Sequence, residues 1–281
     1  MKKIITLVII LILLIASIIY KASTYNPFHI TIRTEKISSN KISTELDGTK
    51  IVYFSDLHFG NYTNQNELNT CVDLINKLDP DVVVFGGDLI DNFSTTNITQ
   101  EQKQKITNSL KTIKASQGKF YILGNHDLES EKSKEEITNI LEYADFSSLI
   151  NKNIQIHNGS NSFFNIVGLD SLLEGNPNLS DAYSNVDDSR YTLSFVHCPD
   201  LFSELPLDKT DYVIAGHSHG GQIYIPLFDN LYRASGCKKY FYGKHNKNAT
   251  TLDISNGVGI TNYCFRLFAP AEIVFYKLSS N

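Results

Sequence analysis

In the stretch KIVYFSDLHFG, residues 50–60, an apolar run of strand length is followed at once by Asp56 and His58. Four later segments repeat this order of an apolar run and then polar residues. They are DVVVFGGDLID (81–91), KFYILGNHD (119–127), YTLSFVHCPD (191–200) and DYVIAGHSHGG (211–221). In open α/β sheets, ligands bind beyond the carboxyl ends of the strands. We therefore expect the polar residues of all five segments to converge on one site.

The polar residues at these strand ends are carboxylates, imidazoles and one amide. They are Asp56, His58, Asp88, Asn125, His126, Asp127, His197, His217 and His219. Five of the eight histidines lie among them, which scattered surface histidines would not do. Such donors suit borderline divalent ions better than a tetrathiolate zinc site does. Two ions that share a carboxylate, about 3.5–4 Å apart, can activate water and hold phosphoryl oxygens, so the set predicts hydrolysis of a phosphoester.

Beyond these segments, strand-length apolar runs alternate with helical patterns, which is typical of an α/β fold. The expected strands are 50–54, 81–85, 119–123, 163–167, 191–196, 212–215, 222–225, 250–254 and 272–278. Apolar residues at helical spacing predict helices near 68–78, 106–113 and 137–141. We expect Asn64 with Glu67 to cap the first of these helices, and Ser133 with Glu136 to cap the last.

The chain has 281 residues, 42% hydrophobic and 20% charged, which excludes disordered and fibrous classes. One large α/β unit can absorb this length. The simplest partition is a membrane anchor at 1–25, a linker with an approach strand at 26–44, and one catalytic domain at 45–281.

The segment IITLVIILILLIASIIY, residues 4–20, has no charged residue. As a helix it approaches the ~30 Å thickness of a bilayer core. It is longer than the apolar core of a usual signal peptide and is not followed by an A-x-A-like site, so a retained anchor is favoured over cleavage. Lys2 and Lys3 precede the segment and only Lys21 follows closely. This predicts a single-pass protein of the cell membrane, with a cytoplasmic N-terminus and an extracytoplasmic catalytic domain.

The charge balance argues against nucleic acid as a partner. The net charge is −5, and without Lys2, Lys3 and Lys21 the remaining 22 basic and 30 acidic residues give −8. Binding to a phosphate backbone depends mainly on Lys and Arg. The four cysteines form no C-x-x-C pair and are expected to lie mostly in the core. Nothing in the sequence predicts the oligomeric state.

The ordered set SDLH, GGD, GNHD, His197 and GHSHGG resembles the calcineurin-like metallophosphoesterases. The likeness continues through GGQIYIPL (220–227), SNGVGI (255–260) and RLFAPAEIVFYKL (266–278). It is similar in particular to a membrane-associated bacterial branch that includes phosphodiesterases and a UDP-2,3-diacylglucosamine diphosphatase. This resemblance implies a four-layer α/β fold, in which a sandwich of two mixed β-sheets is flanked by helices.

The resemblance also implies roles for the strand-end residues. Asp56, His58, Asp88 and His219 would hold one divalent ion, and Asp88, Asn125, His197 and His217 the other, with Asp88 bridging them. The two ions would be Mn²⁺, Fe or Zn²⁺. His126 would act as general acid or oxyanion stabiliser at the leaving group, and Asp127 could hold its ring.

These inferences predict a membrane-anchored, dinuclear-metal phosphoesterase that hydrolyses a phosphodiester, phosphomonoester or pyrophosphate by metal-activated hydroxide. The substrate would be a phosphorylated small molecule or a lipid-linked phosphate, and a nearby bilayer favours the latter. One alternative is a hydrolase like UDP-2,3-diacylglucosamine diphosphatase, which needs its site on the cytoplasmic side. Another is a non-catalytic metal-binding scaffold of the same fold.

Three other features leave alternatives open. Asp91 is expected to cap a helix rather than to support the site. Asp170 either reaches the site or belongs to a turn. The basic and aromatic stretch 232–245, YRASGCKKYFYGKH, is either an edge hairpin with solvated lysines or a surface that binds an anionic head group or membrane.

Overall fold

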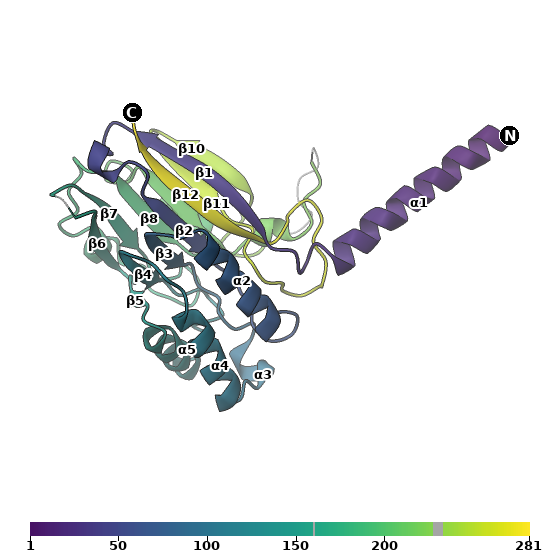
Figure 1. The fold of residues 1–281 in the computed structure, drawn as a ribbon, viewed down its shortest axis with the longest axis horizontal. Helices are drawn as coiled ribbons and strands as arrows, with labels where there is room; N and C mark the ends of the chain where they lie inside the picture. Colours follow the sequence, from purple (N-terminus) through teal and green to yellow (C-terminus); the bar gives the residue numbers. More distant parts are fainter. Residues whose placement is uncertain (160, 227–232) are drawn as a thin grey trace.

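The computed structural model describes residues 1–159, 161–226 and 233–281. Within them the chain forms two six-stranded mixed sheets that pack against each other, with helices outside (Figure 1). The expected two-sheet sandwich is thereby confirmed. An apolar helix, α1, projects from one end of the sandwich.

The first sheet has the order β1-β12-β2-β3-β4-β5. These strands are β1 (Thr31–Ser39), β2 (Lys50–Phe54), β3 (Val82–Phe85), β4 (Gly118–Tyr121), β5 (Ser147–Ser148) and β12 (Glu272–Ser280). Only the β12–β2 pair is antiparallel, so β2, β3 and β4 run side by side in one direction. Their carboxyl ends therefore lie at the same edge, where the polar residues follow them.

The second sheet has the order β10-β11-β9-β8-β7-β6. Its strands are β6 (Lys152–His157), β7 (Phe163–Gly168), β8 (Thr192–Val196), β9 (Tyr212–Ala215), β10 (Gly243–Lys247) and β11 (Thr250–Ile254). The four central strands are parallel, and antiparallel strands close both edges. The ends of β8 and β9 supply the remaining polar segments.

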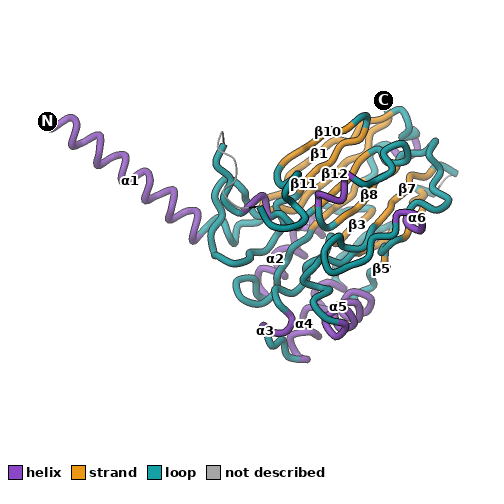
Figure 2. The backbone as a smooth tube through the Cα atoms, turned by 180° about the vertical axis from the view of Figure 1, so that it is seen from behind, coloured by secondary structure: helices purple, strands orange, loops and turns teal. Residues whose placement is uncertain are grey.

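Helices and short turns cover the outer faces of the two sheets (Figures 1 and 2). They are α2 (Gln65–Lys77), α3 (Phe93–Thr96), α4 (Gln100–Lys111), α5 (Glu131–Tyr143) and α6 (Leu179–Ala182), with 3₁₀ turns η1 (Thr44–Leu46), η2 (Pro199–Ser203) and η3 (His219–Gly221). The apolar faces of α2, α4 and α5 share one core cluster with the first sheet. Residues near α6 and η2 pack on the outer face of the second.

Strand β2 shows how the layers are built. Successive side chains of a strand point to opposite faces. Val52 and Phe54 accordingly join the cluster under the helices, whereas Ile51 and Tyr53 join the cluster between the sheets. This accounts for the continuous apolar run in the sequence, since both faces of the strand are buried.

Two local expectations are wrong. Residues 222–225 do not form a strand of either sheet, because Gln222 has a left-handed φ of 55° and Ile223 makes only isolated bridges to Leu267 and Phe268. Helix α5 is not capped by Ser133 and Glu136: its N-cap is Ser130, whose hydroxyl accepts the amide of Ser133. The box of Asn64 and Glu67 at α2 is confirmed.

Helix α1 (Lys2–Thr24) is the candidate membrane span. Its 23 residues correspond to a length of about 35 Å, enough to cross a bilayer core. Of its residues only Ala22 is buried against the rest of the protein. Figures 1 and 2 both show it standing away from the sandwich.

An ion cluster ties β1 to both sheets. Nη1 of Arg33 lies 3.0 Å from Oδ1 of Asp253 in β11, and its Nε lies 3.2 Å from Oε1 of Glu272 in β12. Asp253 is fully buried and also accepts hydrogen bonds from the hydroxyls of Tyr212 and Tyr276 at 3.1 and 2.9 Å. Arg33 is thus the cation that balances a buried carboxylate between the sheets.

Replacing Arg33 with Met should lower the free energy of unfolding by about 3 kcal/mol, because it leaves Asp253 buried without a cation. We take the low end of the range for buried pairs, since 26% of the Arg33 side chain remains exposed. Urea unfolding measures the change. The control is Lys105→Met, which removes the exposed pair with Glu101 and should change stability by no more than about 0.5 kcal/mol. Equal effects of the two substitutions would refute this account.

Candidate metal centre

The five polar segments meet at one place, as the sequence predicts. The structure contains three groups of potential ligands. Within each group, every residue has one donor atom that lies within 4.8 Å of the donor atoms of the others. The groups are Asp56, His58 and His219; His58, Asp88 and His126; and Asp88, His197 and His217. The groups overlap at His58 and Asp88, so the strand ends of both sheets form one continuous cluster.

Asp88 lies at the middle of this cluster. Its Oδ2 is 3.5 Å from Nε2 of His58 and 3.2 Å from Nε2 of His197. The same Nε2 of His58 lies 3.0 Å from Nε2 of His219. One carboxylate is therefore flanked by imidazoles from both sheets.

Four buried atoms in this cluster have no hydrogen-bond partner among the described residues: Nδ1 of His58, Nδ1 of His126, Oδ1 of Asn125 and Nε2 of His197. The two Nδ1 atoms face carboxylates outside the cluster, which leaves Oδ1 of Asn125 and Nε2 of His197 for an ion. The contact of His197 with Asp88 is close enough in distance but is not aligned as a hydrogen bond. Leaving a buried polar atom unpaired costs about 1–3 kcal/mol. A divalent cation bound by these atoms would remove that cost, so the donors fit a metal ion.

Several imidazoles have one ring nitrogen occupied by a neighbour. Nδ1 of His197 lies 2.8 Å from the carbonyl oxygen of Gly86, and Nε2 of His217 lies 2.6 Å from that of Ser235. A carbonyl oxygen accepts the ring proton, so the other nitrogen keeps its lone pair for an ion. The available donors are therefore Nε2 of His197 and Nδ1 of His217.

Asp91 supports His58 by a close contact rather than by an aligned hydrogen bond, since its Oδ1 lies 3.3 Å from Nδ1 of His58. The expectation that Asp91 caps a helix is wrong, because the N-cap of α3 is Asn92. The sequence could have suggested this supporting role, since Asp91 is three residues after Asp88. Asp170 belongs to a turn, where its carboxylate accepts the amides of Ser171 and Asn176.

Five of the seven expected metal ligands have left-handed backbone conformations, with φ between 45° and 68°. They are Asp56, His58, Asp88, His217 and His219. Residues other than glycine rarely adopt this region, and clusters of such residues are typical of functional sites. A side chain at Gly124 would also collide with the Asp88 carboxylate, so glycine is required for the close approach of the two loops. We infer that these unusual backbone conformations serve to position the side chains of the site.

Asp127 does not hold the ring of His126, contrary to expectation. Its carboxylate accepts the backbone amides of Asp88 (2.7 Å), Gly124 (2.9 Å) and Leu89 (2.9 Å). The ring of His126 instead has its Nδ1 3.2 Å from Oε1 of Glu129. Asp127 thus fixes the loop that carries Asp88, and burial together with the Asp88 charge raises its pKa to about 6.

Replacing Asp127 with Asn should weaken Mn²⁺ binding by about 10–100-fold, the usual cost of losing a group that orients metal ligands. The amide nitrogen of Asn cannot accept a backbone N–H, so the Asp88 loop would lose part of its support. Isothermal titration calorimetry measures the affinity. The matched control is Asp170→Asn, another buried turn aspartate, which should leave it unchanged. Unaltered binding in Asp127→Asn would contradict this role.

Arg266 is a buried cation beside the cluster, and no sequence pattern indicates its role. Its Nη2 lies 3.2 Å from Nδ1 of His219 and donates to the carbonyl oxygens of Asn256 and Gly259 at 2.9 and 2.6 Å. Its backbone amide donates to the carbonyl oxygen of Ala22 at the end of α1. The site and the foot of α1 therefore meet at this residue.

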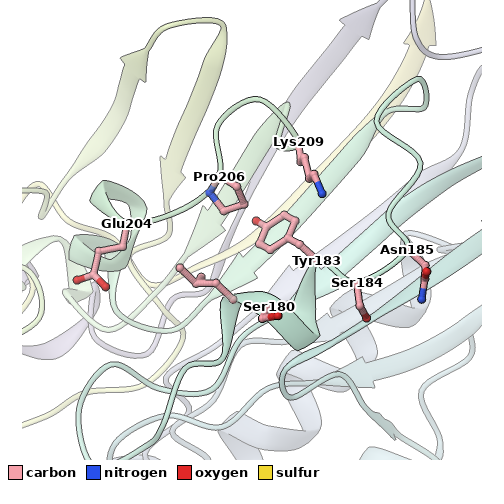
Figure 3. A pocket seen from close by; sticks show the side chains of 8 residues that line it. Ser180, Tyr183, Ser184, Asn185, Glu204, Pro206 and Lys209 are labelled. Carbon is pink, nitrogen blue, oxygen red and sulfur yellow. The ribbon is translucent and has the colours of Figure 1, made fainter.

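The candidate metal ligands form the floor of a cleft of about 940 Å³. The lining includes the candidate ligands and His126, that is His58, Asp88, Asn125, His126, His217 and His219. It also includes Ile223, Ile225, Phe241, Tyr263 and Phe265, which we call the apolar wall. A separate open hollow of about 570 Å³ lies near α6 (Figure 3). Its lining contains one cation, Lys209, and no cluster of metal-ligating residues, so we place the site in the larger cleft.

Within the described part of the basic stretch 232–245, residues 233–242 form loops and turns and only the last three residues belong to the edge strand β10. Tyr232 lies outside the described residues, and β10 at its end pairs with β11. Lys244 forms an ion pair with Glu35, and the amides of Lys238 and Lys239 donate to Asp200. Lys244 thus lies in an edge hairpin and pairs with β1, which agrees with the hairpin interpretation for this end of the stretch.

Comparison with known proteins gives a consistent result. A family model for calcineurin-like phosphoesterases matches residues 49–221. An uncharacterized metallophosphoesterase of Bacillus subtilis, YkuE, is 31% identical over 266 residues, with coverage of 93% of this chain and 90% of the relative. A bovine transmembrane protein with a metallophosphoesterase domain is 24% identical, with coverage of 86% and 55%. Among solved structures, GAP50, the anchor in the inner membrane complex of Plasmodium, matches with a TM-score of 0.45 at 12% identity, with coverage of 82% and 80%.

Proposed function

Because the chain belongs to the calcineurin-like phosphoesterase family, and so is a phosphate-ester hydrolase as its sequence predicts, we propose that it is a membrane-anchored phosphoesterase that works with two divalent metal ions. The observation that carries this proposal is the buried carboxylate of Asp88 between imidazoles of both sheets, beside the unpaired Oδ1 of Asn125. A non-catalytic metal-binding scaffold would need the metal ligands but not a proton donor such as His126 in the same cleft.

The proposed ligands divide into two sets that share Asp88. One set is Asp56, His58, Asp88 and His219, and the other is Asp88, Asn125, His197 and His217. Mn²⁺, Fe and Zn²⁺ all suit such mixed carboxylate and imidazole donors. When bound, the ions lower the pKa of a water molecule and neutralise phosphoryl oxygens.

His126 is the proposed acid at the leaving group. Its side chain is 30% exposed in the cleft, and its Nδ1 lies 3.2 Å from Oε1 of Glu129. In the reaction the oxygen of a water molecule bonds to phosphorus, and the bond from phosphorus to the leaving oxygen breaks. That oxygen keeps the electron pair and takes a proton, which His126 can supply.

The anchor and its orientation complete the proposal. Helix α1 would span the cell membrane once, and Lys2 and Lys3 favour a cytoplasmic N-terminus with the catalytic domain on the other side. A UDP-2,3-diacylglucosamine diphosphatase remains the alternative activity, but it requires the opposite orientation. Either activity uses the same metal centre.

Replacing Asp88 with Asn should lower hydrolysis of bis(p-nitrophenyl) phosphate and p-nitrophenyl phosphate by more than about 100-fold, because loss of a shared ligand exceeds the usual cost of a supporting residue. Activity should also disappear after chelation and return with Mn²⁺. Both are measured by release of p-nitrophenol, with Asp170→Asn as the control expected to retain activity. A fully active Asp88→Asn protein would refute the proposal.

A further inference from the structure

The cleft has an apolar wall that hydrolysis of a small phosphoester does not require. Ile223 and Ile225 are 40% and 44% exposed, and Tyr263 is 77% exposed. Exposed apolar residues that gather at a cleft are typical of a binding surface. A soluble phosphate on the polar floor would leave this wall in water.

The wall is attached to the foot of α1. The amide of Arg266 donates to the carbonyl oxygen of Ala22 at 2.9 Å, and Nδ2 of Asn26 donates to that of Arg266 at 2.9 Å. Sγ of Cys264 lies 3.8 Å from the carbonyl oxygen of Ser23. If α1 spans a bilayer, segment 261–268 is therefore held where the chain leaves it.

The two strips of the wall are joined to each other. The amide of Leu267 donates to the carbonyl oxygen of Gln222 at 2.8 Å, and the amide of Tyr224 donates to that of Leu267 at 2.9 Å. Ile223 lies between these bonds. Backbone hydrogen bonds therefore connect the strip that carries Ile223, through Leu267 and Arg266, to the end of α1.

We propose that the substrate is a membrane lipid phosphoester, bound with its phosphate on the polar floor and its hydrocarbon part along the apolar wall. The lipid enters from the bilayer surface at the foot of α1. This inference rests on the proposed function and names the substrate class of the same site, with water as the only co-reactant. The bilayer covers the wall when the cleft is empty.

The first test follows chain length with full-length protein in phosphatidylcholine vesicles and the p-nitrophenyl phosphodiesters of methanol, butanol and octanol. Burial of one methylene corresponds to a gain of up to about fourfold, so kcat/KM should rise by at least about tenfold from methyl to octyl. Ile225→Asp should reduce the octyl-to-methyl ratio. The control Tyr143→Asp, at an exposed residue of α5, should keep it.

The outcomes separate the two proposals. If the wild-type protein with Mn²⁺ hydrolyses none of these diesters and no p-nitrophenyl phosphate either, the proposed function fails. If it hydrolyses the methyl ester but shows no rise with chain length, or if Ile225→Asp keeps the full rise, the lipid inference is overturned and the phosphoesterase remains.

The second test locates the wall without measuring activity. The chain contains no tryptophan, so Tyr263→Trp introduces a single fluorophore. In vesicles with brominated acyl chains its emission should fall on the order of twofold, because interfacial residues lie about 5–10 Å into the head-group boundary. Tyr143→Trp, on α5 away from α1 in Figures 1 and 2, should not be quenched. Equal quenching of the two variants, or of neither, would overturn the inference.

Discussion

The carboxylate of Asp88 is almost completely buried, and the groups around it balance its negative charge. Burial opposes its ionisation, but the imidazoles of His197 and His58 hold its pKa well below the usual value. Its Oδ1 also accepts the amide of His126, and Asp127 fixes the backbone on either side. Because these contacts come from both sheets, the sandwich cannot separate without exposing the charge. Metal cations, once bound, would balance the charge of Asp88 in the same way.

The sequence predicts this centre well because its chemistry depends on residue types that stand directly after buried strands. The edges were harder to predict: β6 and β10 contain Lys, Asn and His, since only part of an edge strand is buried. The sequence does not predict that Asp127 binds backbone amides or that Asp91 contacts His58, because a carboxylate near a ligand looks the same in sequence whichever group it contacts. Residues 222–225 read as a strand, but the glycine pair before them turns the backbone first.

Arg266 shows a kind of functional residue that a single sequence does not reveal. It lies in an apolar stretch far from the histidines in sequence, yet its guanidinium is fully buried beside His219. There it donates to carbonyl oxygens of the 256–259 loop, which in turn donates its amides to Ser55 and Asp56. Its main chain meets Ala22. A long-range packing relation, rather than a local pattern, therefore connects the apolar helix with the metal ligands.

The pairing of β1 with β12 has a consequence for how the protein is made. These strands run in parallel through nine registered pairs, although Thr31 and Ala271 beside them are 240 positions apart in the chain. Strand β1 emerges from the ribosome some 240 residues before its partner β12. During synthesis the edge of β2 that β12 will cover stays open, and non-local pairing of this kind is slow. The nascent domain therefore completes its first sheet only after β12 has emerged, and it depends on β12 to shield that edge from aggregation.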